Sequence, residues 1–465
     1  MASENESYII IGAGVFGVST ALHLIKKYPN ASVTLVDRDA FDADSRVAAS
    51  WDWNKVVRAD YDDITYCQLA LEAQDVFNSD PLWKPHFHET GIFWMARDDY
   101  ADQVICNYQT LGRKADLSRV SVSEARKMHG GVFRNADYSG VKNVLVNKTS
   151  GWVAAGDCLR SVTRAAIALG VQYVVAEIAT LTLGQDGECT GAVTKSGEIL
   201  TASHTILCAG AYTPKLLDLS ATETGVSELR AGNRIVAGGI TTGMTTLNDS
   251  DFARHEKMPV GVQWYSTYGE LWWLEESLML ASYPVSSSTL LTLIPAPFIG
   301  SLPPTPDREL KWWGQTIFRN TTEVAPGRLI SMPPPQEDYN QWIVSDKLKH
   351  DIRHASHVFY GEPSKSWKLD KYRICWDAFT TSSDFIVSPH AAAKGLYLAT
   401  CGSFHGYKFF PVLGKYVVQM LEGDLSAELQ AKWAWDRQRP DPARNPDWPR
   451  VEMRSYLDDN LTAKL

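Results

Sequence analysis

The sequence of 465 residues has no cluster of positive charge and little cysteine. The formal net charge is −9 and no basic block interrupts the chain, so nucleic acid is not an expected partner. The seven cysteines are scattered, and none forms a C-x-x-C pair. An odd count, behind a polar N-terminus without a hydrophobic leader, favours reduced thiols inside a cell.

Metal ligands and membrane spans are also poorly represented. His86 and His88 have ligand-like spacing, but no pattern of Cys, Asp or Glu completes a site, so we expect no metal. Residues 278–300 carry no charge, as a membrane span would. Pro284, Pro295 and Pro297 interrupt that stretch, so we expect an irregular insertion or a lid there and no membrane helix.

One strong motif lies near the N-terminus. Residues 8–11 form a short apolar run that is typical of a buried parallel strand. Three glycines with G-x-G-x-x-G spacing follow it, namely Gly12, Gly14 and Gly17. The first permits a tight turn, the second lets the backbone approach a pyrophosphate, and the third lets a helix pack closely on the strand.

The residues after these glycines complete a dinucleotide-binding unit. Residues 18–27 predict a helix whose N-terminal N–H groups face the phosphates, and residues 33–36 predict a second strand. Asp37 ends that strand, 20 residues after Gly17, where a carboxylate can accept a hydrogen bond from a ribose hydroxyl. The position of this unit at the start of the chain favours FAD over NAD.

The chain is too long for one ordinary domain, so we expect two interleaved domains. Apolar patterns and caps predict helices at residues 64–78, 157–169, 341–359 and 411–421. They predict further strands at residues 171–177, 192–201, 205–207, 230–242, 258–264 and 395–399. The tail from residue 433 to 449 is rich in Trp, Arg and Pro, and we expect it to wrap the surface.

Two basic residues, Lys55 and Arg58, lie in the stretch AASWDWNKVVRADYDD. They could share one face that points at a cofactor or an anionic substrate, or belong to an ordinary surface salt-bridge cluster. The residues alone leave both interpretations open. Further along, Ala209 and Gly210 follow a predicted strand, and their small side chains let the backbone contact a dinucleotide.

Several stretches together resemble the monomeric sarcosine oxidase and amadoriase (fructosyl amino acid oxidase) family of FAD-dependent amine oxidases. The similarity is greatest to the fungal amadoriase and saccharopine-oxidase-like branch, and it covers nearly the whole chain outside the tail. The matching stretches are IIIGAGVFGVSTALHL, WNKVVRADY, TILCAGAYT, PVGVQWY, RLISMPPPQEDY, RICWDAFTTSSDFIVSPH and CGSFHGYKFFPVLGKYVV.

This resemblance implies an α/β fold with a Rossmann-like, GR2-type FAD-binding domain, a parallel sheet flanked by helices. That domain interleaves with an α+β substrate domain on a mostly antiparallel sheet. The expected FAD-binding domain comprises residues 1–85, 150–218 and 362–430, and the substrate domain residues 86–149 and 219–361. Residues 431–465 form the tail.

The resemblance also implies roles for single residues. Cys375 in RICWD occupies the position that attaches FAD through a thioether to the flavin 8α-methyl group, although a buried core cysteine is the commoner fate of this residue type. Lys408 in FHGYKFFP matches a lysine near the flavin N1/O2 edge, where its charge stabilises the anionic reduced flavin. Lys55 and Arg58 match basic residues near the flavin and the substrate, and Arg58 is the better candidate for a substrate carboxylate.

A further lysine is expected beside flavin N5, where its charge speeds the reaction with oxygen. The sequence Gly269-Glu270-Leu271 is followed by Trp272, whereas the stretch RELK ends in Lys311, and we give the role to Lys311. Residues 266–306 then form an insertion relative to the family, either a lid or translated intron sequence.

The expected cofactor-binding residues combine the motif and the resemblance. They are Gly12, Gly14, Val15, Phe16, Gly17, Asp37, Arg38, Lys55, Ala209, Gly210, Cys375, Gly402, Gly406, Tyr407 and Lys408. The expected catalytic residues are Lys311, Lys408, Arg58 and Lys55, and we interpret Tyr61, Trp264 and His405 as candidates that shape the pocket.

The implied activity is oxidation of the C–N bond of a secondary amine to an imine, with O2 reduced to H2O2. The substrate is an N-substituted amino acid such as a fructosyl amino acid, saccharopine or an N-methyl amino acid. Three alternatives stay open. They are a biosynthetic tailoring oxidase whose imine is trapped by cyclisation, a flavin-binding protein inactivated by the insertion, and an NAD-dependent dehydrogenase.

The chain ends in Ala463-Lys464-Leu465, a variant of the peroxisomal S-K-L address. We therefore expect a peroxisomal import receptor as a partner and the peroxisome, which destroys hydrogen peroxide, as the location. The other expected partners are the amine and O2, with no nucleic acid and no membrane, and we expect a monomer.

Overall fold

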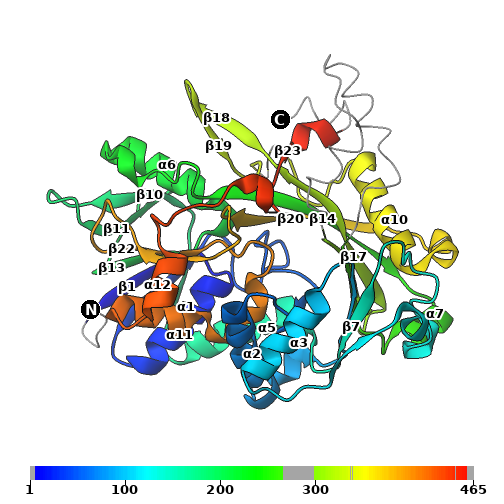
Figure 1. The fold of residues 1–465 in the computed structure, drawn as a ribbon. Helices are drawn as coiled ribbons and strands as arrows, with labels where there is room; N and C mark the ends of the chain where they lie inside the picture. Colours follow the sequence, from blue (N-terminus) through cyan, green and yellow to red (C-terminus); the bar gives the residue numbers. More distant parts are fainter. Residues whose placement is uncertain (1–5, 265–297, 336, 338, 446, 458–465) are drawn as a thin grey trace.

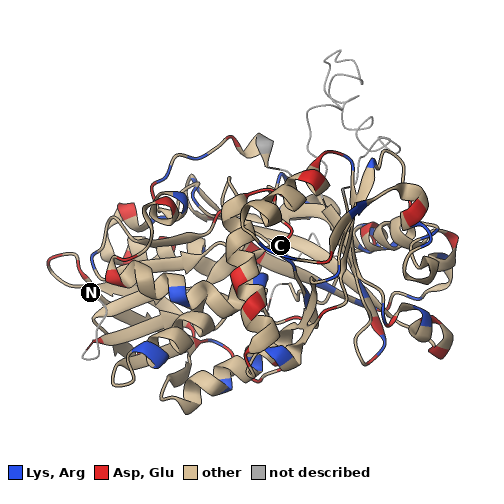
Figure 2. Ribbon diagram, turned by 60° about the horizontal axis from the view of Figure 1, so that its bottom comes forward, with Lys and Arg blue, Asp and Glu red and all other residues tan. Residues whose placement is uncertain are grey.

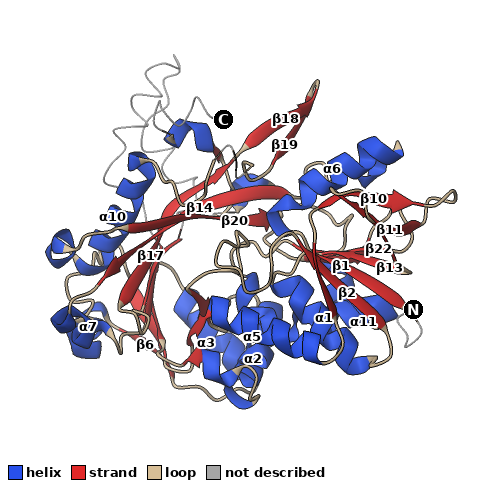
Figure 3. Ribbon diagram, turned by 180° about the vertical axis from the view of Figure 1, so that it is seen from behind, coloured by secondary structure: helices blue, strands red, loops and turns tan. Residues whose placement is uncertain are grey.

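Two β-sheets lie side by side, and most helices gather along one side of the molecule (Figure 1, Figure 3). The computed structural model describes residues 6–264, 298–335, 337, 339–445 and 447–457. The fold class expected from the sequence is confirmed, because a parallel α/β unit interleaves with a unit built on a mostly antiparallel sheet. Among the described helices, none has both the length and the apolar character that a membrane crossing requires.

The smaller sheet carries the glycine motif. Its strand order is β21-β22-β13-β1-β2-β9, with β21 antiparallel to β22 and the other pairs parallel. The strands are β1 (Ser7–Ile11), β2 (Ser32–Asp37), β9 (Gln172–Val175), β13 (His204–Leu207), β21 (Ile386–Pro389) and β22 (Leu396–Thr400). Strands β1 and β13 are apolar and buried on both faces, as a parallel sheet covered by helices requires.

The helices α1 (Val15–Lys27) and α11 (Phe410–Glu422) lie on one side of this sheet, and α6 (Thr213–Thr224) lies on the other (Figure 3). Gly414 makes the contact between α1 and α11 close, because a Cβ atom there would lie 2.0 Å from the Ser19 carbonyl oxygen. The Gly414 N–H donates to Ser19 Oγ at 2.8 Å. Ser19 Oγ in turn donates to the Phe410 carbonyl at 2.7 Å, which fixes the start of α11 over the sheet.

The larger sheet has nine strands in the order β20-β14-β17-β16-β15-β5-β7-β6, and the short β23 pairs with β17. The pairs are antiparallel except β15 with β5 and β17 with β23. The strands are β5 (Ile92–Ala96), β6 (Leu117–Val120), β7 (Asn143–Asn147), β14 (Val236–Thr246), β15 (Val260–Trp264), β16 (Phe298–Leu302), β17 (Glu309–Arg319), β20 (Lys371–Phe379) and β23 (Val451–Glu452).

Smaller elements connect the two sheets. The short sheet β3 (Asn54–Val57), β8 (Gly151–Ala154) and β4 (Phe87–His88) lies between them, next to α2 (Ile64–Ser79), α3 (Tyr100–Thr110) and α5 (Ala155–Ala168). The strands β10 (Ile178–Leu183), β11 (Cys189–Thr194) and β12 (Ile199–Thr201) form another small sheet, and β18 (Thr321–Ala325) with β19 (Arg328–Ser331) forms a projecting hairpin (Figure 1). The short helices are α4 (Val122–Ala125), α7 (Asp249–His255) and α12 (Ala427–Trp433).

The long strand β17 shows how the sheet divides its residues between two environments. Side chains alternate across a strand, so Lys311 and Trp313 face the interior between the two sheets, while Trp312 packs against α10 (Asp346–Tyr360) on the other face. Helix α10 begins later than the helix expected at residues 341–359. Ser345 caps it by accepting a hydrogen bond from the Leu348 N–H at 3.3 Å.

Two segments lie elsewhere than we expected. Residues 298–302, which we included in the insertion, form β16 in the middle of the larger sheet, between β15 and β17. Residues 266–297 of the predicted insertion lie outside the described residues, and residues 303–306 connect β16 to β17. Strand β20, which we placed in the FAD-binding domain, pairs along its full length with β14 of the larger sheet.

After the stretch expected to wrap the surface, the chain pairs with the larger sheet. Val451 and Glu452 pair with Phe318 and Arg319, so β23 extends the larger sheet next to β17. In Figure 2, Lys and Arg positions are interspersed with Asp and Glu positions over the helices and loops.

Candidate active site

A cavity of about 560 Å³ runs from the glycine turn of the smaller sheet to the inner face of the larger sheet. The carboxyl ends of β1, β2 and β13 open into one end of it, which is where parallel α/β sheets bind their ligands. Residues of β14, β17 and β20 line the other end. We call these the nucleotide end and the inner end.

The glycine turn brings backbone segments close together at the nucleotide end because its glycines carry no Cβ atom. Gly12 has a φ of +106°, and a Cβ atom on it would lie 2.5 Å from the Cys208 carbonyl oxygen. Gly17 does not line the cavity, because it packs on the turn, where a Cβ atom would lie 1.9 Å from the Gly12 carbonyl oxygen. Helix α1 therefore packs closely on the turn after β1, and its N-terminus points at the cavity.

Asp37 and Arg38 lie at the edge of the nucleotide end. One oxygen of Asp37 accepts a hydrogen bond from the Ala13 N–H at 2.7 Å, and the buried Arg46 lies 3.4 Å from the same oxygen. Arg38 stacks on the Tyr212 ring, with its guanidinium carbon 4.5 Å from the ring centroid. The Asp37 carboxylate thus fixes the glycine turn and still borders the space that a ribose would occupy.

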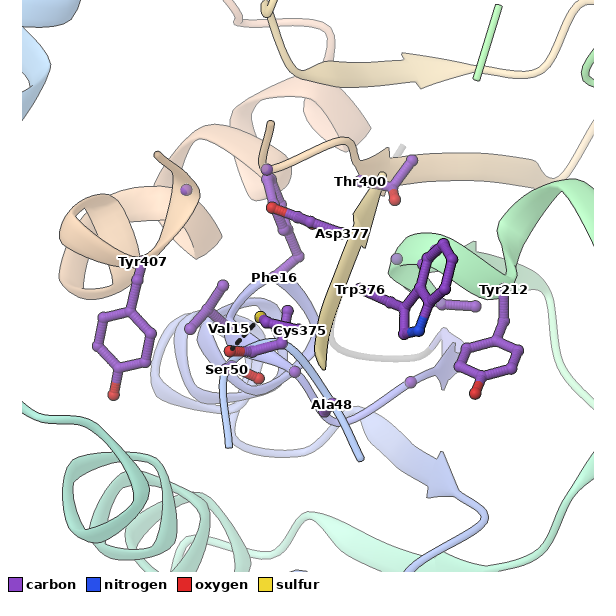
Figure 4. Close-up of a pocket in the computed structure, with 18 of the residues that line it drawn as sticks. Val15, Phe16, Ala48, Ser50, Tyr212, Cys375, Trp376, Asp377, Thr400 and Tyr407 are labelled. Carbon is purple, nitrogen blue, oxygen red and sulfur yellow. Dashed lines mark hydrogen bonds between the residues drawn. The ribbon is translucent and has the colours of Figure 1, made fainter. Parts of the chain in front are cut away.

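Cys375 projects from β20 into the cavity towards Val15 and Ser50, whereas the next residue, Trp376, lies beside Tyr212 (Figure 4). The thiol is buried, and Lys55 Nζ lies 3.7 Å from its sulfur atom. This cysteine therefore stands in the wall of the cavity between the two ends, with a lysine beside it.

Behind the cavity wall, one buried carboxylate gathers three cations. Lys311 Nζ lies 2.7 Å from Asp52 Oδ1, and Lys55 Nζ lies 2.7 Å from Asp52 Oδ2. The Arg373 guanidinium lies 3.9 Å from Asp52 Oδ1 and donates to the backbone carbonyls of Trp51 and Ala48. Asp52 thus joins β3 and its preceding loop to β17 and β20, which belong to the larger sheet.

The pKa values of this cluster follow from burial and from its three-to-one excess of cations. Burial opposes ionisation of Asp52, but Lys311, Lys55 and Arg373 hold its pKa well below the usual range. Burial is the largest influence on Lys311 and lowers its pKa to about 8 despite the Asp52 charge. Desolvation lowers the pKa of the half-buried Lys55, but Asp52 keeps it above the ordinary value. The cluster therefore carries positive charge at the inner end.

Arg58 adds a further cation to this end of the cavity. Its guanidinium lies between two aromatic rings, 4.5 Å from the Tyr61 centroid and 4.7 Å from the Trp94 centroid. One nitrogen, Nη1, donates to the Asp60 carbonyl and to the Tyr100 hydroxyl. The rings and these acceptors hold the planar Arg58 guanidinium in one orientation at the cavity wall, as recognition of a carboxylate requires.

Lys408 is buried near Arg58 without a carboxylate partner among the described residues, and its ammonium donates to the His405 carbonyl at 2.9 Å. Burial, with the charges of Arg58 and Lys55, lowers its pKa well below the ordinary value. His405 Nε2 faces the Ser383 carbonyl at 2.8 Å and Nδ1 faces the Tyr61 hydroxyl at 3.0 Å. Nε2 therefore carries the hydrogen, and burial lowers the pKa of His405 to about 3, so the ring is neutral.

The loop before Lys408 is strained. Cys401, Ser403 and Phe404 have φ values of +68°, +45° and +61°, which residues other than glycine rarely adopt. Asp377 holds the loop, because its carboxylate accepts hydrogen bonds from the Phe404 N–H at 2.9 Å and the Ala378 N–H at 2.8 Å. Burial raises the pKa of this carboxyl group. The bend brings residues 401–408, which precede α11, into the wall of the cavity.

The structure brings most of the predicted site residues to one cavity. Those that line it are Gly12, Gly14, Val15, Phe16, Asp37, Arg38, Lys55, Arg58, Ala209, Gly210, Lys311, Cys375, Gly402, Gly406, Tyr407 and Lys408. His405 also lines the cavity, whereas Tyr61 lies behind it and binds His405.

Sequence reasoning missed Asp52, Arg373, Asp377 and the tail residue Asp447, which also lines the cavity. A signal existed for Asp52, because an acidic residue between two tryptophans, in the stretch WDW, is an unusual surface pattern.

The residues present fit FAD. The turn at Gly12 and the N-terminus of α1 suit a pyrophosphate, Asp37 borders the ribose position, and the cavity continues past Cys375 to a surplus of positive charge. A flavin is the chemically appropriate occupant, because its pyrimidine edge takes up negative charge on reduction.

Comparisons with known proteins agree with this geometry. The model of a family described as FAD dependent oxidoreductase matches residues 7–420. L-saccharopine oxidase of Schizosaccharomyces pombe is 24% identical over 473 residues, with 98% of each chain covered, and an amino acid oxidase of Aspergillus flavus is 24% identical, with 90% of this chain and 92% of the relative covered.

Solved structures show the same fold. A fructosyl peptide oxidase has a TM-score of 0.78 at 22% identity, covering 98% of this chain and 99% of that one. The fructosamine oxidase of Aspergillus fumigatus called Amadoriase II has a TM-score of 0.76 at 22% identity, covering 98% and 97%.

We predict that Asp52→Asn lowers the free energy of unfolding by about 3–5 kcal/mol, because it leaves buried cations without their counter-charge. The double variant Asp52→Asn/Lys311→Met should be more stable than Asp52→Asn alone, since it removes the nearest uncompensated cation. Urea unfolding followed by tryptophan fluorescence measures both.

The control is Asp116→Asn, which removes the partner of Lys148 in an ion pair where both side chains are more than half exposed. We expect a change of less than about 1 kcal/mol for it. Equal losses for Asp52→Asn and Asp116→Asn would contradict the stabilising role of Asp52.

Proposed function

The chain belongs to the FAD dependent oxidoreductase family, and from this premise we propose that it is an amine oxidase acting on N-substituted amino acids. The observation that supports this most directly is the positive inner end of the cavity, where Arg58 and Lys408 face a space beyond Cys375. That space suits a small anionic substrate next to a flavin.

Arg58 and Lys408 are the groups that would bind the substrate carboxylate. The arginine is held rigid by its two aromatic neighbours, so little side-chain entropy is lost when it binds a ligand. Lys408 has a lowered pKa and no counter-ion among the described residues, so an arriving anion would restore its charge. The neutral His405 adds no charge and supports Lys408 through its carbonyl group.

The relatives support the same class of substrate. The names of the curated relatives describe oxidases of L-saccharopine and of amino acids, and the similar structures are fructosyl peptide and fructosamine oxidases. An N-substituted amino acid combines the carboxylate that Arg58 would bind with the C–N bond to be oxidised. Saccharopine, fructosyl amino acids and N-methyl amino acids are the candidates.

FAD, when bound, would supply the redox chemistry: the amine would lose a hydride from the carbon next to its nitrogen and a proton from the nitrogen, and O2 would take up both as H2O2. The chain orients the amine and excludes water from the inner end. Lys311 and Lys55 place positive charge there, held by Asp52, where negative charge develops during the reaction with oxygen.

The activity is tested by incubating the yellow protein with a panel of secondary and primary amino acids and measuring peroxide with a peroxidase-coupled dye. We expect peroxide with N-substituted amino acids, and none with amines that lack a carboxylate. A protein that keeps its flavin and produces no peroxide with any member of the panel would refute the proposal.

Lys311→Met should slow the reaction with O2 by about 10²–10³-fold while amine oxidation under nitrogen changes little, because the variant removes charge that the oxygen step needs. In the wild type, the oxygen step should also slow as the pH rises through and above about 8, where Lys311 loses its proton. Stopped-flow recovery of the flavin absorbance measures both.

Lys142→Met, at an exposed lysine, is the control and should leave the rate and its pH dependence unchanged. An oxygen step that is unaffected in Lys311→Met would transfer the role to Lys55 or Lys408.

We further propose that Cys375 would hold FAD covalently through a thioether, in which a C–S bond replaces the thiol S–H bond and one C–H bond of the flavin 8α-methyl group, and O2 takes up the two hydrogens as H2O2. The thiol lies in the cavity wall between the nucleotide and inner ends, and Lys55 Nζ lies 3.7 Å from its sulfur atom.

After denaturation in SDS, the wild-type band should therefore show flavin fluorescence and the Cys375→Ala band should not. Cys208→Ala, at another buried cysteine of the same cavity, should keep the fluorescence. Fluorescence in the denatured Cys375→Ala protein would exclude this attachment point.

The last three residues lie outside the described part of the chain, and we propose that they direct the protein to the peroxisome. A fluorescent fusion that ends in Ala463-Lys464-Leu465 should co-localise with a peroxisomal marker, and removal of these residues should disperse it.

A further inference from the structure

Behind the wall at the inner end of the cavity, one aromatic ring contacts both cations of the proposed carboxylate site. The Tyr61 ring is buried and does not line the cavity. The guanidinium carbon of Arg58 lies 4.5 Å from the ring centroid, and Nζ of Lys408 lies 5.7 Å from the same centroid. Both of these cations do line the cavity. Tyr61 is thus a shared neighbour of the two groups, and the substrate itself would not touch it.

Lys408 needs such a neighbour, because the charges that act on it most strongly are positive. Arg58 and Lys55 both repel its ammonium group, and burial withdraws that group from water. The groups that offset this cost are uncharged. They include the His405 carbonyl, which accepts a hydrogen bond from Nζ at 2.9 Å, and the π face of the Tyr61 ring.

Arg58 is the better stabilised of the two cations. Carboxylates act on it, among them that of Asp60 behind the wall and that of Asp447 from the tail. The Tyr61 ring therefore matters most for the charge of Lys408. It also sets the spacing between the two cations, because one ring contacts both of them.

A hydrogen bond fixes the Tyr61 ring in this position. The hydroxyl donates to His405 Nδ1 at 3.0 Å, because the other ring nitrogen, Nε2, donates to the Ser383 carbonyl at 2.8 Å. At the backbone, the Tyr61 carbonyl accepts a hydrogen bond from Asn107 Nδ2 at 2.9 Å. His405 thus contacts both parts of the arrangement, since its side chain binds the Tyr61 hydroxyl and its carbonyl binds the Lys408 ammonium.

We propose that Tyr61 is a positioning residue that makes Arg58 and Lys408 act as one clamp for the substrate carboxylate. This inference rests on the proposed amine oxidase function and adds a residue to the site that it describes. A π face attracts cations and carries no net charge, so it holds the two groups near each other without neutralising them. An acidic residue in the same place would cancel part of the charge that the substrate carboxylate complements.

The test measures the binding of two unreactive ligands to the yellow protein from the change in flavin absorbance. N-acetylglycine carries a carboxylate, N-acetylglycinamide is its uncharged analogue, and the wild type should prefer the carboxylate. Tyr61→Leu should weaken the binding of N-acetylglycine by about 10–100-fold, because two cation–π contacts are lost, and leave that of the amide unchanged. Tyr61→Phe keeps the ring and should retain most of the preference. Tyr61→Met replaces Tyr61→Leu if the latter does not fold with its flavin.

A double variant tests whether Tyr61 acts through Lys408. Tyr61→Leu and Lys408→Met should each weaken the binding of N-acetylglycine. In the double variant the combined loss should be smaller than the product of the two single losses by about threefold or more, because the second change removes a contact that is already broken.

The matched control is Tyr138→Leu. Tyr138 is also buried, its ring lies under a guanidinium, that of Arg126 at 4.3 Å from the centroid, and its hydroxyl donates to the Phe133 carbonyl at 3.2 Å. It lies outside the lining of the cavity, so both ligands should bind to this variant as they bind to the wild type.

Four results would overturn the inference. They are a wild type that does not prefer the carboxylate, a Tyr61→Leu variant that keeps the preference, an equal weakening of both ligands, which would make the role of Tyr61 structural, and losses in the double variant that multiply fully. The proposed function fails separately, if the protein binds N-acetylglycine and oxidises no amine. The binding test needs no turnover, so it still decides the role of Tyr61 in that case.

Discussion

The buried carboxylate of Asp52 is the constraint on which the inner end of the cavity depends. It draws Lys55 from β3, Lys311 from β17 and Arg373 from β20 to one point between the two sheets. Burying three cations would be costly without a counter-charge, and one carboxylate offsets part of that cost while leaving a net positive charge. The same contact therefore joins the two sheets and sets the electrostatics beside Cys375.

A second carboxylate performs a related task for the backbone. Asp377 lies two residues after Cys375 on the same face of β20 and accepts the N–H of Phe404. It holds three residues with positive φ in a turn that leads into α11. Strand β20 thereby positions the Cys375 thiol relative to Lys408 and to the start of α11. Strain of this kind persists only where the surroundings over-determine it, which is typical of functional sites.

The charges of the cavity change in character along its length. At the nucleotide end, backbone N–H groups and a helix N-terminus face an anion, and Asp37 fixes the turn. At the inner end, side-chain cations dominate, and the tail residue Asp447 also lines the cavity. A cofactor that spans both ends is a ligand that such a cavity complements.

The sequence by itself determined the features that depend on neighbours along the chain. The glycine turn, its helix and Asp37 follow from local spacing, and the resemblance in RICWD and FHGYKFFP led to Cys375 and Lys408. Lys311 could also be chosen over Trp272 by motif. Tertiary structure alone decided the rest, because pairing of distant strands carries no local signal. It made residues 298–302 the central strand β16, brought Asp52 to Lys311 across 259 positions, and carried Asp447 from the tail into the cavity. A buried ion pair or a pairing of distant strands can be recognised only when both partners are seen in space.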